Sequence, residues 1–313
     1  MSRFFEKLSK ALGLNYVWWH WRWLRFKQRL KSSFSTDTNT ARHLRSRQRI
    51  CRCGALAGAG DRTCGVCGAK LPSAAANYLA KVFGLILPGV SPVTAGLITL
   101  IAVDFLFQMI LTGGSALLRP SLESLLRAGA LESQLVASGQ WWRLLTSVFV
   151  HIGVIHLLFN LYALVSVSHF LEREIGSARY LALFLLAGIG GSAASYALRT
   201  EVVMAGASGA LFGLIGFSIA YFRRQGGARA QAIQSFMLRW AIYGFVFGLM
   251  VRADNLAHAG GFVTGFLLGS IMEFRADEMR KRAPAWKILA GLFFAVLVIS
   301  FVLLIKAPPI IFR

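Results

Sequence analysis

A serine and a histidine in the apolar part of the chain could together carry out nucleophilic chemistry. Ser208 follows Gly206 and precedes Gly209, and His258 lies further along the chain in a second glycine-rich segment. A histidine that contacts a serine hydroxyl can remove its proton and later give that proton to a leaving amine. Asp254, four residues before His258, lies nearer the start of that segment, so no third acidic partner is evident. The sequence therefore predicts a dyad and not a triad.

Three more polar residues could assist such a dyad. His151, His156 and Asn160 follow one another closely in an apolar stretch upstream of Ser208. The oxyanion that develops during acyl transfer needs hydrogen-bond donors, and Asn160, His156 and the backbone N–H of Ser208 are suitable. Each residue alone is weak evidence, because a buried histidine often serves packing and a helical serine usually bonds the carbonyl four residues back.

The composition indicates where these residues lie. Of the 313 residues, 56% are hydrophobic and only 15% are charged, and the mean hydropathy is +0.58. A chain with so little polar surface cannot coat a water-soluble globule, and the same composition excludes disorder and fibrous repeats. The net charge of +21 is typical of proteins that meet nucleic acid or an anionic membrane surface.

Seven apolar segments are each long enough to cross a bilayer as a helix. They are 92–111, 151–170, 181–198, 203–222, 236–251, 256–274 and 286–305. A basic stretch at 275–285 separates the last from the others. Counting spans places His156, Ser208 and His258 at a similar depth below one surface, with Ser208 about two turns into its segment. Polar groups at one depth in a membrane favour a functional site.

The basic residues predict the orientation. Apart from the N-terminal head, the loops on the N-terminal side hold 9 Lys and Arg in 34 residues, against 7 in 55 on the other side. The positive-inside rule then places the N-terminus in the cytoplasm and the polar cluster near the outer surface. No signal peptide is evident at the N-terminus, so the default location is the bacterial inner membrane.

Glycines indicate how two of the helices approach each other. Gly209 and Gly213 form one small-residue stripe, and Gly261, Gly265 and Gly269 form another. Such stripes let two helix backbones come close. Because His258 shares the glycine face of its segment and Ser208 precedes the other stripe, the two side chains are expected to meet. Plain helix packing without chemistry would fit the glycines equally well.

A polar head precedes the membrane body. Residues 1–78 hold 15 Lys and Arg against 3 acids, together with all four cysteines, Cys51, Cys53, Cys64 and Cys67. Four thiolates can close a tetrahedral structural zinc site, and the glycine after each pair permits a tight turn. The segment resembles a zinc ribbon, although its first pair is C-x-C and not C-x2-C. Disulfides or free thiols are the alternatives.

The first forty residues form a separate basic and aromatic segment. At helical spacing in 16–30, Trp19, Trp23 and Phe26 share one face, with arginines on another side. Such a helix suits either an interface with anionic lipid or packing on its own domain. We expect an anionic lipid or a cytoplasmic partner for this head, and no nucleic acid.

The polar residues of the body together resemble the rhomboid family of intramembrane serine proteases. The resemblance is carried by His151, His156 and Asn160 on one span, by Gly206, Ser208 and Gly209 on another, and by His258, Gly261 and Gly265 on a third. Trp142-Arg143 in the first loop and Glu172-xxx-Gly176 also match. The three patterns in this order, on the right spans, are specific together.

The resemblance implies an all-α six-helix bundle with one additional C-terminal transmembrane helix and a water-filled cavity open to the outside. It implies Ser208 as nucleophile and His258 as general base, with no cofactor for catalysis. His156 and Asn160 would line the oxyanion hole, and His151 would be a structural or cavity residue. Trp142-Arg143 would anchor the first loop, and Phe212 would pack against the His258 ring.

On this basis the chain divides into four parts. They are the basic aromatic segment 1–40, the zinc-ribbon-like segment 41–75, the rhomboid-like core 90–275 and the additional helix 286–306. The predicted function is hydrolysis of peptide bonds in transmembrane protein substrates within the lipid bilayer.

Three other classes of function compete with this prediction. A catalytically silent relative that binds or escorts membrane proteins usually lacks the serine or the base, and both are present here. A transporter would need polar residues along a full path, whereas these lie at one depth. A zinc protease is set aside because His151 and His156 do not form an H-E-x-x-H pattern.

Overall fold

The computed structural model comprises two units, Met1–Leu79 and Ala80–Arg313, which we describe separately. The residues that it describes are 48–50, 56–58, 61, 63–66, 68, 90–112, 114, 117–118, 120–199, 203–251 and 253–307. The amphipathic segment expected at 16–30 and three of the cysteines, Cys51, Cys53 and Cys67, lie outside these residues. In the first unit, β1 (Gln48–Ile50) pairs antiparallel with β2 (Leu56–Gly58).

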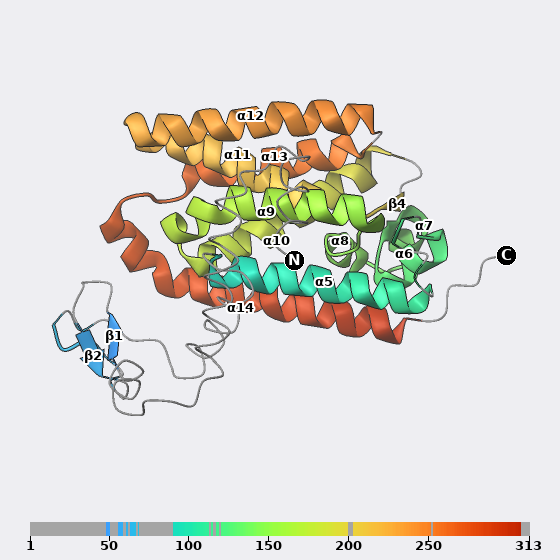
Figure 1. Ribbon diagram of the computed structural model, residues 1–313, viewed down its shortest axis with the longest axis horizontal. Coiled ribbons are helices and arrows are strands. Elements are labelled where there is room, and N and C mark those ends of the chain that lie inside the picture. Colours follow the sequence, from blue (N-terminus) through green and yellow to red (C-terminus); the bar gives the residue numbers. More distant parts are fainter. Residues whose placement is uncertain are drawn as a thin grey trace, which may run out of the picture. The chain divides into compact units, whose positions relative to one another are not determined.

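Helices dominate the second unit (Figure 1). The long helices are α5 (Pro92–Leu111), α9 (Gly153–Ile175), α10 (Ser177–Leu198), α11 (Ser208–Gln225), α12 (Ala228–Met250), α13 (Asn255–Ile271) and α14 (Ala276–Lys306). Between α5 and α9 the first loop forms three short helices, α6 (Leu122–Ala128), α7 (Ser133–Ala137) and α8 (Arg143–Thr146). A two-residue strand in that loop, β3 (Leu131–Glu132), pairs antiparallel with β4 (Val203–Met204). Each long helix overlaps one predicted span, as expected for an all-α polytopic membrane protein.

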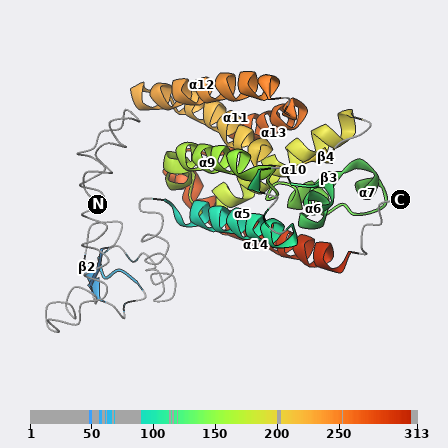
Figure 2. The same cartoon turned by 45° about the vertical axis from the view of Figure 1, so that its right-hand side comes forward.

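Four of these helices, α5, α10, α12 and α14, are long and apolar enough to cross a membrane. The other three carry the polar residues of the expected site. α11 ends in two arginines and a glutamine within its 18 residues, and α13 has only 17 residues. Both views place α12 on one side of the bundle and α5 and α14 on the other, with α11 and α13 between (Figures 1 and 2). Burial of every residue of α11 from 209 to 222 agrees with this interior position.

The glycine stripes bring α11 and α13 into contact as predicted. A Cβ atom added at Gly261 would overlap the carbonyl oxygen of Gly209, and one at Gly265 would overlap that of Gly213. One turn further along, a Cβ atom added at Gly269 would also overlap the carbonyl oxygen of Phe217, though less severely. The two backbones therefore touch over three successive turns, at a separation that only glycine allows on the α13 side.

A third helix joins this contact, which the sequence did not predict. Gly191 of α10 lies against the carbonyl oxygen of Ala257, and a Cβ there would come within 2.7 Å of it. Gly190 and Gly260 are in similarly close contact across the α10–α13 interface. The helices that bear Ser208 and His258 are thus both packed against α10.

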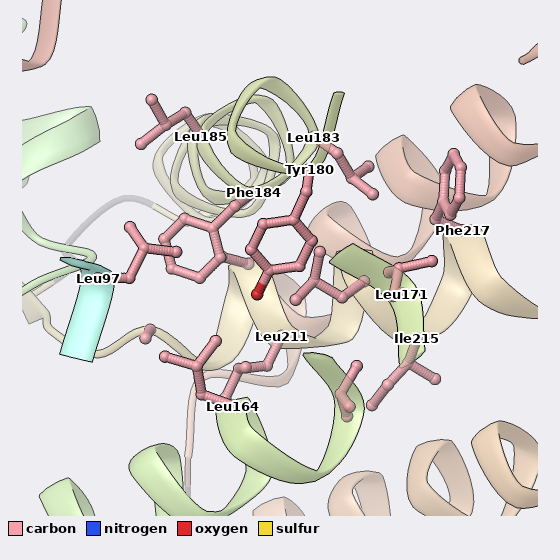
Figure 3. Close-up of a cluster of buried hydrophobic side chains, with 14 of the residues drawn as sticks. Leu97, Leu164, Leu171, Tyr180, Leu183, Phe184, Leu185, Leu211, Ile215 and Phe217 are labelled. Atoms are coloured by element: carbon pink, nitrogen blue, oxygen red, sulfur yellow. The ribbon is translucent and has the colours of Figure 1, made fainter. Parts of the chain in front are cut away.

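A hydrophobic core lies between α5, α9, α10 and α11 (Figure 3). The ring of Tyr180 is fully buried among leucines of α9, α10 and α11, and its hydroxyl is hydrogen-bonded to Ser168. This pairing satisfies a polar group that would be costly to bury alone. The packing holds α11 firmly against the outer helices.

Glu172, near the end of α9, caps the start of α5. Its Oε1 accepts from the Val93 N–H at 3.0 Å and its Oε2 from the Thr94 N–H at 2.9 Å. The hydroxyls of Thr94 and Ser177 donate to the same carboxylate. The first N–H groups of a helix have no partner within it, and a carboxylate there also opposes the helix dipole. The Glu172 that the sequence analysis noted is therefore a structural link between two helices.

The basic stretch before the last apolar span is helical. α14 begins at Ala276 and runs for 31 residues, with Pro284 inside it, so it includes most of the basic stretch 275–285 as well as the apolar span 286–305. Turns of the helix on both sides of Pro284 keep their hydrogen bonds, so one missing N–H is tolerated. The basic residues therefore lie on the first turns of a continuous helix.

A charged cluster fixes the start of α14 to the core. Oε1 of Glu273, between α13 and α14, accepts from Arg179 Nη2 at 2.7 Å and from Trp286 Nε1 at 2.8 Å. Arg179 also donates to the Met279 carbonyl at 2.7 Å. Burial opposes the charge of Glu273, but the hydrogen bonds from Arg179 and Trp286 outweigh it and lower the pKa of this carboxyl.

Candidate active site

Ser208 is the first residue of α11, which differs from the prediction. We expected a helix from residue 203 with Ser208 about two turns inside, but Val203 and Met204 pair with the first loop as β4. Gly206 then turns the chain with φ +131°, a conformation that only glycine adopts readily, and its N–H donates to the Ser147 carbonyl at 2.9 Å. Ser208 therefore lies at the positive end of the helix dipole, beside N–H groups without helical partners.

His258 lies one turn inside α13 and contacts this serine. Its Nε2 is 2.9 Å from Ser208 Oγ, although the two residues are 50 positions apart in the chain. Asp254 caps the helix by accepting from the Ala257 N–H at 3.1 Å, which fixes where α13 begins. The expected meeting of the two side chains is therefore present, and the imidazole is 5% exposed.

Two further contacts hold the imidazole ring. Phe212, one turn after Ser208, stacks on it with centroids 4.3 Å apart and planes at 14°, which confirms the predicted packing. Asn255 Oδ1 lies 2.9 Å from His258 Nδ1. Asn255 was not predicted as a site residue, although an asparagine three positions before a histidine at a helix start lies on the same face of the helix.

His156 faces the serine from α9. The Ile152 N–H donates to its Nδ1 at 3.2 Å, so the neutral ring carries its proton on Nε2. That nitrogen lies against Gly206, where an added Cβ would be 3.0 Å from it. His156 is therefore prepared to donate a hydrogen bond beside Ser208.

His151 and Asn160 both contact His156 but do not line the cavity beside Ser208. His151 is completely buried, its ring centroid is 5.2 Å from that of His156, and its Nδ1 contacts the Phe149 carbonyl oxygen at 2.9 Å. Asn160 donates through Nδ2 to the His156 carbonyl at 2.9 Å. Neither is among the residues that line the cavity, so in this conformation both act on His156 and its helix.

A cavity of about 520 Å³ opens beside Ser208 and His156. Its wall includes both residues, Gly206 and Gly209, and apolar side chains of α9 and α12, among them Phe159 and Phe247, whose rings pack 5.3 Å apart. An ion pair lies on the wall as well, with Arg199 Nη1 3.8 Å from Asp254 Oδ2. The space is large enough for a short stretch of extended peptide together with water.

The first loop is anchored by Arg143, which is 1% exposed. Its guanidinium donates to the carbonyls of Leu126 and Ala130 at 2.8 and 2.7 Å and to Gln140 Oε1 at 2.7 Å. Burial lowers the pKa of Arg143 to about 10, still far above neutral pH. Arg143 thus joins three separate positions of the first loop, and a shared anchoring role for Trp142 stays a prediction.

Three of the four predicted metal ligands lie outside the described residues. Among the residues with described positions, no three His, Cys, Asp or Glu side chains are close enough to hold a metal ion. Of the four cysteines, Cys64 alone belongs to that set, and it is buried. Gly68, with φ +68°, donates its N–H to the Cys64 carbonyl at 2.8 Å.

Comparison with known proteins identifies the class of membrane protein to which this site belongs. The model of the rhomboid domain matches residues 138–274, which include every helix that carries the site. The rhomboid-family protein YdcA of Bacillus subtilis (strain 168) is 35% identical over 138 residues, covering 42% of this chain and 68% of the relative. The chain therefore belongs to the rhomboid family.

This chain matches only part of the length of two other relatives. Rhomboid protease GluP of Bacillus subtilis (strain 168) is 37% identical over 189 residues, which is 59% of this chain and 36% of the relative. RHOMBOID-like protein 5 of Arabidopsis thaliana is 37% identical over 168 residues, which is 51% of this chain and 53% of the relative. The matched regions thus cover about a third to a half of these two proteins.

Proposed function

We propose that this protein is an intramembrane serine endopeptidase that hydrolyses peptide bonds of transmembrane proteins. The observation that carries the proposal is the 2.9 Å contact between His258 Nε2 and Oγ of Ser208, a residue that lines a cavity. Membership of the rhomboid family, which includes proteins named as proteases, supports it. Ser208 is the nucleophile and His258 the general base.

The reaction runs in two halves. Ser208 Oγ attacks the scissile carbonyl carbon while its proton moves to His258 Nε2. The tetrahedral intermediate then collapses, the C–N bond breaks, and His258 gives the proton to the leaving amine. In the second half a water attacks the acyl-serine ester and gives one proton to His258. That proton passes to Ser208 Oγ as the ester C–O bond breaks, and the product leaves as a carboxylic acid, which then loses its remaining proton to water.

Donors at the start of α11 and on α9 stabilise the oxyanion. The start of α11 supplies the N–H groups of Ser208 and Gly209, and His156 supplies Nε2–H. Asn160 contributes through its amide, either directly when substrate is bound or by holding the turn of α9 that carries His156. His151 supports the His156 ring from the buried side.

The substrate helix must unwind locally before it can react. A helical amide is shielded by its own hydrogen bonds, whereas Ser208 needs an open face of the carbonyl carbon. Helix-breaking residues such as glycine or proline near the scissile bond therefore favour cleavage. Lys and Arg are more frequent in the loops on the same side of the membrane as the N-terminus. This excess supports a cytoplasmic N-terminus in the bacterial inner membrane, with cleavage near the outer surface.

Labelling with a fluorophosphonate distinguishes this proposal from a silent rhomboid-like protein that binds or escorts membrane proteins. An activated serine is phosphonylated, so the purified protein in detergent should gain one adduct, located by peptide mass spectrometry at Ser208. The H258A variant should lose labelling because its serine has no base. Absence of an adduct in the wild-type protein, with its helical content intact, would favour the silent alternative.

The head is proposed to be an accessory to this protease core. We propose that residues 41–75 form a zinc-ribbon-like segment with Cys51, Cys53, Cys64 and Cys67 as ligands, because four thiolates suit tetrahedral zinc. The buried Cys64 and the hydrogen bond from the Gly68 N–H to its carbonyl fit such a site. Residues 1–40 bind anionic lipid or a cytoplasmic partner. The core spans 90–275, and 286–306 form the additional membrane helix.

Zinc content tests the proposed head. The full-length protein, purified without chelator, should contain about one zinc per chain by elemental analysis. The C64S/C67S double variant should lose nearly all of it, because two ligands cannot hold the ion. Protease activity should persist in the variant, since four cysteines leave no open position for catalysis. A wild-type protein without stoichiometric zinc would contradict the proposed site.

A further inference from the structure

The histidine of the dyad has a partner on each of its two ring nitrogens. Nε2 contacts Ser208 Oγ, and Nδ1 lies 2.9 Å from the side-chain oxygen of Asn255. An amide oxygen only accepts hydrogen bonds, so this contact requires a proton on Nδ1. A neutral ring with its proton on Nδ1 has a lone pair on Nε2, which is the form that can accept the serine proton.

We infer that Asn255 is a positioning residue of the protease, which selects this tautomer of His258 and fixes the angle of its ring. The inference rests on the proposed function. If the amide of Asn255 were reversed, its NH2 group would need a lone pair on Nδ1. The ring proton would then sit on Nε2 and face the Ser208 hydroxyl, and the base could not act.

The neighbouring carboxylate cannot take this role because it is engaged elsewhere. Asp254 Oδ1 caps α13 at the Ala257 N–H, and Oδ2 accepts from the Ser195 hydroxyl and forms the ion pair with Arg199. Asp254 therefore fixes the start of the helix, and Asn255 fixes the ring. A neutral third residue also orients the ring without placing a second charge against it.

The backbone of α12 covers the contact between Asn255 and His258. A Cβ added at Gly248 would lie 2.5 Å from Asn255 Oδ1 and 3.3 Å from His258 Nδ1. Phe212 stacks against the ring at the same time. The hydrogen bond is thus shielded from competing water, and the Asn255 side chain has little room to turn away.

The charged and titratable groups near the ring come from three helices. They are Asp254 at the start of α13, Arg199 at the end of α10 in its ion pair, and His156 of α9. Substitutions at Asn255 leave all three in place. A change in the pH dependence of the reaction then reports on the Asn255 contact itself.

The test measures fluorophosphonate labelling of full-length protein in detergent, as a rate and as a final labelled fraction, across pH 5 to 9. The N255A variant should label about 10- to 100-fold more slowly with an unchanged final fraction, and its kcat for a transmembrane substrate should fall while KM stays the same. The N255D variant restores the acceptor and adds a negative charge. Because a negative charge beside His258 favours the protonated imidazole, the labelling rate of N255D should begin to fall at a pH about 1 unit higher than that of the wild type as the solution is acidified. S270A is the matched control, because Ser270 bonds only its own helix at the far end of α13.

Three results would overturn the inference. The first is an N255A rate equal to that of the wild type. The second is an unchanged rate with a reduced final fraction, because Asn255 would then merely stabilise the fold. The third is a labelling rate of N255D that depends on pH in the same way as that of the wild type. This third result tests the inference even if N255A does not fold. A wild-type protein that never labels overturns the proposed function instead.

Discussion

Replacing Ser208 with alanine is expected to abolish cleavage of a transmembrane reporter substrate in proteoliposomes. Ser208 supplies the only hydroxyl that contacts His258 Nε2 among the described residues, so no acyl-enzyme can form without it. Loss of a nucleophile that acts together with its base typically lowers kcat by at least about 10⁴-fold. Cleavage is followed by gel separation of the products. H258A should be as inactive, since the two residues act as a unit.

The matched control is S218A. Ser218 is a buried serine of the same helix whose hydroxyl bonds only the Leu214 carbonyl, four residues back. Removing that hydroxyl should leave cleavage within about twofold and thermal stability nearly unchanged. Residual cleavage by S208A at a substantial fraction of the wild-type rate would reject the assignment of the nucleophile.

Replacing Gly265 with alanine is expected to cause the largest loss of stability from a single methyl group. The new Cβ would overlap the Gly213 carbonyl oxygen, and a backbone atom cannot move aside as a flexible side chain can. Separating α11 from α13 should cost at least about 2 kcal/mol, which lowers the melting temperature by roughly 4–8 °C. Thermal unfolding in detergent measures this. Activity should fall as well, because the two helices carry Ser208 and His258.

G96A is the control with the same chemical change. Gly96 lies in α5, and an added Cβ there would meet nothing within 4 Å. Because alanine is the better helix former, this variant should be unchanged or more stable by up to about 1 kcal/mol. If G265A were as stable as G96A, the close backbone contact between α11 and α13 would not exist.

Local patterns in the chain predicted the parts of this site well. Continuous apolar runs predicted the helices, since the cost of unpaired backbone groups in lipid leaves a helix as the only choice for such a run. Glycines at spacings of four predicted which faces of α11 and α13 meet, and with them the contact between Ser208 and His258. These signals suffice because each depends on residue types within one or two turns of a helix.

Features that depend on distant partners were not predicted. An apolar run from residue 203 gives no sign that Val203 and Met204 pair with a strand some 70 residues upstream, which moves the helix start to Ser208. The glycines of α10 gave no sign that they face Ala257 and Gly260. Asn255 was not singled out, because its hydrogen bond to His258 depends on the side-chain geometry that only the folded helix shows.

By itself, the sequence determined the residue types of the site, the helices that carry them and the close approach of two of those helices, because these follow from composition and short-range periodicity. Only the tertiary structure decided where α11 begins, which nitrogen of His258 faces Asn255, and how α12 and α10 enclose the pair. The physical reason is that hydrogen bonds and strand pairs join groups far apart in the chain, and their geometry exists only once the helices have packed.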